Sequence, residues 1–171
     1  HHRLSVFGER VEDVFAGPGP STRRESLTED IDADVAIIGA GFTGLWTAYY
    51  LLEANPRLKV VVLEAEYAGF GASGRNGGWA SALFPKSLDS LSAGSSPEAA
   101  LALDSAMRAS VREIERVTVA EGINADVRRG GTIVLTRNSA QRVRALREVD
   151  HARSWGLGAD KLRWLDEDLA R

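Results

Sequence analysis

The sequence predicts an α/β fold, and three features between residues 34 and 64 predict it. A short apolar run at residues 35–38, Val-Ala-Ile-Ile, ends at a glycine, which is typical of a strand buried on both faces. Residues 43–53 have the composition of a helix, and Pro56 stops it shortly afterwards. Residues 59–63 form a second, β-branched run. Strand, helix and strand within about thirty residues make a βαβ unit, in which two parallel strands are joined by a right-handed crossover.

Three segments are expected along the chain. Residues 1–33 are predicted to form an N-terminal arm, because the sequence Gly-Pro-Gly-Pro at residues 17–20 prevents regular structure and the residues after it are mostly polar. Residues 34–92 hold the βαβ unit and a glycine-rich loop. Residues 93–171 are expected to begin a second, α+β domain that the chain does not complete.

A long helix is predicted at the start of the second domain. Ser96 and Pro97 have the pattern of an N-cap followed by proline at the first helical position. The helix then continues to about residue 121 with an apolar stripe along one face, and core packing explains this stripe more simply than a binding surface does. Residues 87–96, which are small and polar, are predicted to be a linker. The stripe consists of Leu103, Met107, Val111, Ile114 and Val117.

The segment after this helix is expected to contain a hairpin and another helix. Residues 126–129 and 131–136 are two short extended runs that meet at a pair of glycines, so a hairpin or a turn is predicted. Asn138 followed by Gln141 resembles a capping box, which would begin a helix running towards Trp155. His151 falls on this helix without a companion ligand, so no metal site is predicted.

Composition narrows the classes of function. The 21 basic and 24 acidic side chains give a formal net charge of −3 and form no patch, so neither nucleic acid nor an anionic membrane is an expected partner. No apolar run approaches the roughly 20 residues that a membrane span requires. The absence of cysteine excludes disulfides and thiolate nucleophiles and suits a reducing compartment. We therefore expect a soluble, cytoplasmic protein.

A glycine motif lies between the first predicted strand and the predicted helix. Residues 39–44 fit the pattern G-x-G-x-x-G, which also occurs in ordinary turns. Between a strand and a helix it has a physical meaning: the first glycine permits a tight turn, the second lets the backbone approach a pyrophosphate, and the third lets the helix pack closely. The helix N-terminus offers N–H groups and the positive end of its dipole to phosphates. This is the fingerprint of a Rossmann-like fold, and its predicted nucleotide-binding residues are Gly39, Gly41, Phe42, Thr43 and Gly44.

Glu64 supplies the second part of this fingerprint. It ends the second predicted strand, about 20 residues after Gly44, where an acidic side chain accepts hydrogen bonds from the adenosine ribose. A lone glutamate at a strand end is usually solvated, but the register with the glycine motif favours ribose binding. Ala65 beside it is included in the predicted site. Glu66 adds a second negative charge, which disfavours the 2′-phosphate of NADP.

A second motif, Gly-Ala-Ser-Gly-Arg-Asn-Gly-Gly-Trp, occupies residues 71–79. Residues 34–79, and this stretch above all, resemble the D-amino-acid-oxidase-like flavoprotein superfamily. Within it the likeness is greatest to the group of glycine/sarcosine oxidase and gamma-glutamylputrescine oxidase. Residues 44–51 are similar to the same group, and residues 130–133 and 164–166 more loosely so.

The resemblance implies FAD as the cofactor, with the second motif lying along it towards the isoalloxazine ring. Backbone N–H groups in a loop of small residues can face an anionic ligand, and an arginine there can meet a phosphate or the flavin edge. Without the first motif, a flexible turn with a solvated arginine would be the simpler explanation. The cofactor-binding residues implied by the resemblance are Ala72, Ser73, Arg75, Asn76, Gly77 and Gly78.

The resemblance also implies an activity. A C–N bond of an amine or amino acid would be oxidised to an imine, with O2 as the acceptor and hydrogen peroxide as a product. The flavin carries the redox chemistry while the protein binds and orients the substrate, and no catalytic residue is nominated. Superfamily members add a substrate-binding sheet and return to the FAD domain near the C-terminus. The remaining C-terminal part of the same protein is therefore an expected partner.

Two alternatives remain open from the sequence. An NAD-linked dehydrogenase uses the same βαβ unit, but leaves residues 72–78 unexplained. A non-catalytic nucleotide-binding module could retain the fold without the chemistry, since a fold does not determine a function. Binding of FAD, of NADH or of neither would distinguish the three.

Overall fold

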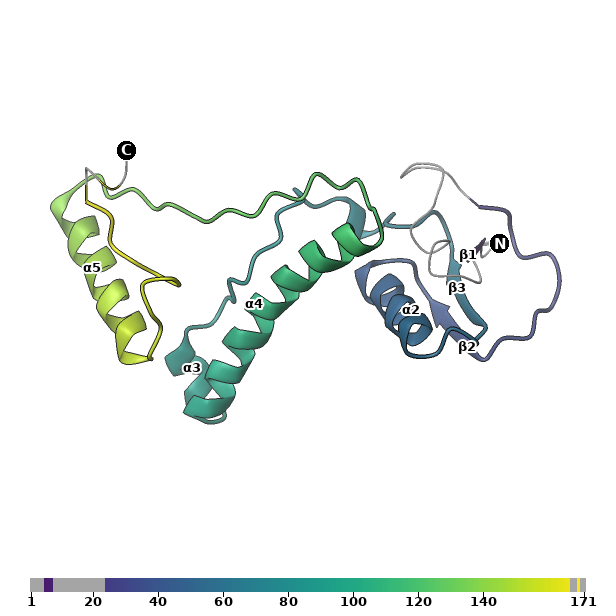
Figure 1. Ribbon diagram of the computed structural model, residues 1–171, viewed down its shortest axis with the longest axis horizontal. Coiled ribbons are helices and arrows are strands. Elements are labelled where there is room, and N and C mark those ends of the chain that lie inside the picture. The colour runs from purple at the N-terminus through teal and green to yellow at the C-terminus, as the bar shows by residue number, and fades with distance from the viewer. Residues whose placement is uncertain (1–4, 8–23, 167–168, 170–171) are drawn as a thin grey trace. The chain divides into compact units, whose positions relative to one another are not determined.

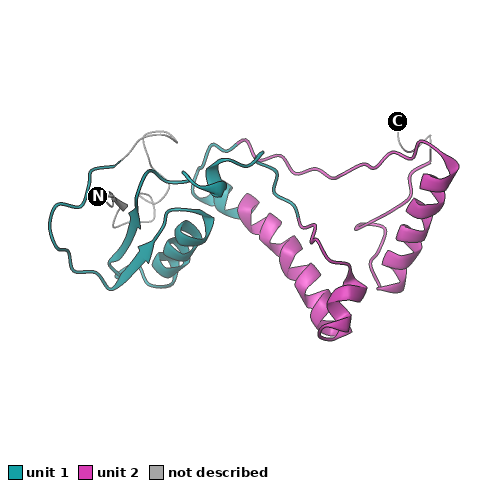
Figure 2. Cartoon of the chain, turned by 180° about the vertical axis from the view of Figure 1, so that it is seen from behind, with its two compact units in different colours: residues 1–81, 116–125 teal, residues 82–115, 126–171 magenta. Residues whose placement is uncertain are grey.

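The computed structural model describes residues 5–7, 24–166 and 169. The chain divides into two compact units, which Figure 2 shows in different colours. Unit 1 comprises His1–Ser81 and Arg116–Ala125, and unit 2 comprises Ala82–Glu115 and Asp126–Arg171. Both predicted cofactor-binding motifs therefore fall in unit 1.

Unit 1 contains the predicted βαβ arrangement (Figure 1). β2 (Val35–Ile38) pairs in parallel with β3 (Val60–Glu64), in a register that places Val35 opposite Val60. α2 (Phe42–Ala54) connects the two strands and ends directly before Asn55 and Pro56. The predicted α/β fold class is confirmed.

A third strand, β1 (Ser5–Phe7), pairs antiparallel with β3 and makes the strand order β1-β3-β2. It lies in the N-terminal arm, where the sequence predicted no regular structure. Strand addition to a sheet edge uses backbone N–H and C=O groups, so the side chains of an added strand need show no pattern. The Gly-Pro-Gly-Pro sequence lies outside the described residues.

A small apolar core joins α2 to the sheet. Ala48 and Leu52 of α2 pack with Val60 and Val62 of β3, and all four side chains are at most 2% exposed. β2 differs, because its burial alternates along the strand and Ile38 is 83% exposed. The prediction that this strand is buried on both faces was wrong for the described part of the chain, where packing reaches only one face of β2.

The end of α4 (Pro97–Ala120) also belongs to unit 1 and is joined to α2. The fully buried Tyr49 donates its hydroxyl hydrogen to the Glu121 carboxylate at 3.1 Å. Arg116 lies 3.9 Å from the Glu53 carboxylate. Burial, followed by the bond to Glu121, raises the pKa of Tyr49 above its ordinary value.

Unit 2 begins with a short helix in a segment that was predicted to be a linker. α3 (Leu88–Ala93) starts after Ser87, whose hydroxyl accepts a hydrogen bond from the Ser90 N–H at 3.2 Å. This N-cap explains why a small, polar segment is helical here.

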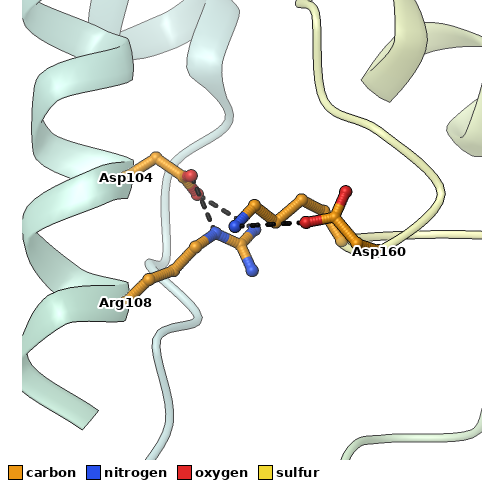
Figure 3. Close-up of polar contacts among 4 residues, drawn as sticks. Asp104, Arg108 and Asp160 are labelled. Atoms are coloured by element: carbon orange, nitrogen blue, oxygen red, sulfur yellow. Dashed lines mark hydrogen bonds and ion pairs between the residues drawn. The ribbon is translucent and has the colours of Figure 1, made fainter. Parts of the chain in front are cut away.

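The greater part of α4 lies in unit 2, and its start is as predicted. The Ser96 hydroxyl accepts from the Ala99 N–H at 3.2 Å, and Pro97 is the first helical residue. Val117 of the predicted stripe is buried, and its other four members are partly buried. On the polar side, Asp104 and Arg108 form an ion pair at 2.8 Å, and Figure 3 shows Asp160 close to this pair.

α5 (Ser139–Ser154) begins at the predicted N-cap Asn138, but the Gln141 side chain reaches one residue further back than in a capping box. The Asn138 side chain accepts from the Gln141 N–H at 2.9 Å, and the Gln141 side chain accepts from the Arg137 N–H at 2.6 Å. Two residues at the end of the helix contact one carboxylate of α3: His151 Nε2 lies 2.9 Å and Trp155 Nε1 3.0 Å from Asp89.

The predicted hairpin is absent from the described structure. Residues 126–136 carry no strand, and the side chains of Ile133, Val134 and Leu135 are 67–80% exposed. The hairpin prediction was wrong because two extended runs joined by glycines still need a register in which their side chains are buried together.

In the part of the chain that the structure describes, none of the helices combines the length and the apolar character that a membrane span requires. No group of three or more His, Cys, Asp or Glu side chains there could hold a metal ion.

Candidate cofactor-binding site

The first glycine motif forms the turn between β2 and α2. Gly39 has a φ of +98°, which favours glycine, and its N–H donates to the Leu63 carbonyl of β3 at 2.7 Å. A Cβ on Gly44 would collide with the Gly39 carbonyl oxygen and lie 3.3 Å from the Ile37 side chain. The first turn of α2 can therefore lie against the end of β2 only because residue 44 is glycine.

The N-terminus of α2 presents amide groups that its own sequence does not cap. Gly41 is the N-cap and offers no side-chain acceptor, and the first turn contains no acidic residue. Among the described residues, we find no acceptor for the amide N–H of Thr43 or Gly44. Unpaired amides and the positive end of the helix dipole together suit an anionic group such as a phosphate.

Glu64 lies beside this turn, as its position in the sequence predicted. One of its carboxylate oxygens accepts from the Ala40 N–H at 2.8 Å, and the other accepts from the Glu66 N–H at 3.1 Å. The carboxylate is thus held by the backbone and is not simply solvated at a strand end. Each oxygen has two lone pairs, so each can still accept a further hydrogen bond from a ribose hydroxyl. Ala65 follows at the bend after β3.

The second glycine-rich segment is attached to the first at two points. The Gly69 N–H donates to the Ala40 carbonyl at 2.9 Å. The Ser73 hydroxyl accepts from the Phe42 N–H at 2.9 Å, at the first residue of α2. A Cβ on Gly41 would lie 3.1 Å from this hydroxyl, so the two segments touch. The structure therefore brings together predicted residues that are 31 positions apart in the chain.

The remaining residues of the second motif lie on an exposed turn. The Asn76 side-chain amide donates to the Ser73 carbonyl at 2.6 Å, and its oxygen accepts from the Gly78 N–H at 2.8 Å. Asn76 thereby braces its own loop. Ala72, Arg75, Gly77 and Gly78 are exposed, and among the described residues no hydrogen bond links these four to the first glycine motif.

Two contributors to this site were not predicted from the sequence. Ala40 supplies an N–H to Glu64 and a carbonyl to Gly69, using only its backbone. Phe70 lies under the Arg75 guanidinium, 4.5 Å from Arg75 Cζ to the ring centroid. Backbone contacts of this kind cannot be predicted from residue type. An aromatic residue in a glycine-rich loop is a signal that could have indicated Phe70.

Comparison with known proteins agrees with this geometry. Residues 34–171 match the DAO family, described as FAD dependent oxidoreductase. The chain belongs to this family. The family assignment makes FAD the cofactor and removes the NAD-linked alternative that the βαβ unit alone left open.

Individual relatives match over shorter stretches. Gamma-glutamylputrescine oxidoreductase of Escherichia coli is 38% identical over 110 residues, covering 64% of this chain and 25% of the relative. Probable oxidoreductase OrdL of Haemophilus influenzae is 43% identical over 89 residues, covering 52% and 18%. Thiamine thiazole synthase of Aspergillus fumigatus is 35% identical over 81 residues, covering 42% and 24%. The chain therefore spans a quarter or less of the length of these relatives. No solved structure matches it.

Proposed function

We propose that this FAD-dependent oxidoreductase oxidises a C–N bond of an amine or amino acid to an imine. The relative named for gamma-glutamylputrescine, an amine, covers 64% of the chain, whereas the Aspergillus fumigatus thiamine thiazole synthase covers 42%. The motif at residues 71–79, which resembles the amine-oxidising group, supports the same substrate class.

One structural observation carries the cofactor part of this proposal. The Ser73 hydroxyl accepts a hydrogen bond from the Phe42 N–H, so the second glycine-rich segment lies against the N-terminus of α2. A dinucleotide whose pyrophosphate lies at that helix end would contact both segments at once. The second segment would then lead from the pyrophosphate towards the flavin.

The residues of unit 1 divide the binding of FAD among them. Gly39, Gly41 and Gly44 keep the backbone close to the pyrophosphate, the unpaired amides of Thr43 and Gly44 donate to it, and Phe42 holds Ser73 beside it through its own N–H. Glu64, with Ala65 beside it, accepts from the ribose hydroxyls. The second segment binds the flavin side of the cofactor. Its binding residues are Ala72, Ser73, Arg75, Asn76, Gly77 and Gly78.

The reaction is balanced by a two-electron acceptor. Removing two electrons and two protons from an H–C–N–H group gives the imine, which water hydrolyses to a carbonyl compound and an amine or ammonia. FAD supplies the acceptor when bound, and O2 would carry the electrons and protons away as hydrogen peroxide. The residues described here bind and orient the cofactor, and we assign none of them a proton-transfer role.

The first test is an absorbance spectrum of the purified gene product, with release and identification of any chromophore. Flavin bands and released FAD, followed by peroxide production with an amine or amino acid, are the expected results. A protein that holds FAD but oxidises no amine would contradict the substrate class. A colourless protein that rejects added FAD would contradict the whole proposal and favour a non-catalytic module.

A sharper test uses Glu64→Gln, which removes the negative charge but keeps one acceptor oxygen. Hydrogen bonds to charged groups contribute about 1.5–3 kcal/mol, so FAD affinity should fall roughly tenfold or more in a titration of the flavin-free protein. Glu66→Gln makes the same change of charge two residues further along the chain and is expected to alter the affinity much less. Equal losses in both variants would mean that charge near this site, and not the Glu64 contact, controls FAD binding.

A further inference from the structure

The loop after β3 contains a stacked pair, Arg75 and Phe70, of which only Arg75 has a proposed binding role. Arg75 Cζ lies 4.5 Å from the centroid of the Phe70 ring. The Phe70 ring is itself met edge-on by Tyr67, with centroids 5.2 Å apart and ring planes at 84°. The side chain of Arg75 therefore rests on a ring that is held in place from another side.

Backbone contacts explain why residues five positions apart are stacked. The Phe70 N–H donates to the Tyr67 carbonyl at 3.0 Å, and the Arg75 N–H donates to the Ala72 carbonyl at 3.2 Å, so each residue ends a tight turn. The two turns are pressed together, because a Cβ on Gly74 would collide with the Gly69 carbonyl oxygen. Only a residue without a side chain lets the second turn approach the first this closely.

Stacking also determines which part of Arg75 is available to a ligand. A guanidinium that lies over an aromatic face uses its flat side for the ring and keeps its N–H donors at the edge. In the described part of the chain, no carboxylate forms an ion pair with Arg75, and its side chain is exposed. Ser73, two positions earlier, is the residue that contacts the N-terminus of α2.

We infer that Phe70 is a positioning residue, which holds the Arg75 guanidinium so that its N–H edge donates to an oxygen of bound FAD. This inference rests on the proposed function, because it requires that Arg75 faces the cofactor. This oxygen belongs either to the anionic pyrophosphate or to a carbonyl at the pyrimidine edge of the flavin. Phe70 acts on that oxygen only through Arg75.

The test is a double-mutant cycle on FAD affinity, measured by quenching of FAD fluorescence as the flavin-free gene product is titrated. A cation–π contact at an exposed site contributes about 0.5–1 kcal/mol, so Phe70→Leu should weaken FAD binding about two- to fivefold. In an Arg75→Gln background, Phe70→Leu should have no further effect. Phe70→Tyr should restore affinity, and Phe70→Trp should equal or exceed it, because tryptophan is the best cation–π partner.

Several outcomes would overturn the positioning role. If Phe70→Leu costs the same affinity with and without the Arg75 side chain, then Phe70 acts through loop packing. The same conclusion would follow if Phe70→Tyr or Phe70→Trp were as weak as Phe70→Leu. Matching circular dichroism spectra and urea midpoints for each variant would ensure that the affinities compare folded proteins.

Titration with ADP identifies the oxygen, because ADP carries a pyrophosphate but no flavin. An equal loss of ADP and FAD affinity in Phe70→Leu would assign the contact to the pyrophosphate, and a loss for FAD alone would assign it to the flavin. A wild-type protein that binds no FAD would refute the proposed function together with this inference. Additive effects in a protein that does bind FAD would refute the inference alone.

Discussion

β2 and residues 132–135 are both runs of four residues rich in β-branched side chains, Val-Ala-Ile-Ile and Thr-Ile-Val-Leu, yet only β2 is a strand. β2 pairs along its length with β3, which the same βαβ unit supplies 25 positions later, with Val35 opposite Val60. Among the described residues, no strand pairs with residues 132–135, and Ile133, Val134 and Leu135 are 67–80% exposed. Strand-forming sequence is therefore not sufficient, because the backbone groups of a strand need a partner.

The largest predicted difference between the two regions is in the free energy of unfolding that is lost when a leucine is replaced by alanine. Leu52→Ala removes a side chain that is 2% exposed in the core between α2 and β3, whereas Leu135→Ala removes one that is 77% exposed. We expect Leu52→Ala to lower the free energy of unfolding by about 2–5 kcal/mol. Leu135→Ala should change it by less than about 0.5 kcal/mol. Urea unfolding followed by circular dichroism measures both, and a large loss for Leu135→Ala would show that this segment is buried in solution.

Glycine substitutions test the same difference between the βαβ unit and the segment around residues 132–135. A Cβ at residue 44 meets the Gly39 carbonyl oxygen, but a Cβ at residue 130 meets nothing within 4 Å. Gly44→Ala should therefore cost about 1–3 kcal/mol of stability, since α2 must move away from β2. It should also weaken FAD binding. Gly130→Ala should unfold at nearly the wild-type urea concentration; equal midpoints for the two variants would contradict the close packing at Gly44.

The smallest expected effect concerns Tyr49. Tyr49→Phe removes the hydroxyl that donates to Glu121 and should lower the free energy of unfolding by about 1 kcal/mol near neutral pH. The pKa of Tyr49 is raised in the folded state, chiefly by burial. Its contribution is therefore fully present below the unfolded pKa of about 10 and is lost as the pH rises through the higher folded pKa.

This pH dependence is tested by measuring the free energy of unfolding of the wild type and of Tyr49→Phe between pH 8 and pH 11. The advantage of the wild type over Tyr49→Phe should shrink above about pH 10, because only the unfolded tyrosine ionises readily there. A difference that stays constant with pH would mean that the pKa of Tyr49 is unshifted and its hydroxyl solvated, and a difference that grows would mean that the folded state lowers this pKa.

Local sequence was sufficient where partners lie close together in the chain. The glycine at residue 44, the proline after Asn55 and the acidic residue at the end of β3 predicted the βαβ unit and the position of Glu64. The caps at Ser96 and Asn138 predicted where α4 and α5 begin, because a cap needs only an N–H two or three residues away.

Predictions failed where the deciding contact lies elsewhere in the fold. β1 joins the sheet through backbone groups, and Ile38 is exposed although its run of residues looks like a buried strand. At the site, the Ala40 carbonyl accepts from Gly69 and the Ala40 N–H donates to Glu64. Residue type cannot predict these contacts, because they use only the backbone of Ala40.

The sequence by itself determined the βαβ unit, the two glycine motifs and the family, because these depend on residue type and on spacing along the chain. Only the tertiary structure decided that Ser73 contacts the first residue of α2 and that Arg75 stacks on Phe70. The physical reason is that turns are folded against each other by backbone hydrogen bonds, which every residue except proline can donate. The fold of the turns therefore decides which side chains meet, as Ser73 meets the Phe42 N–H and Arg75 meets the Phe70 ring.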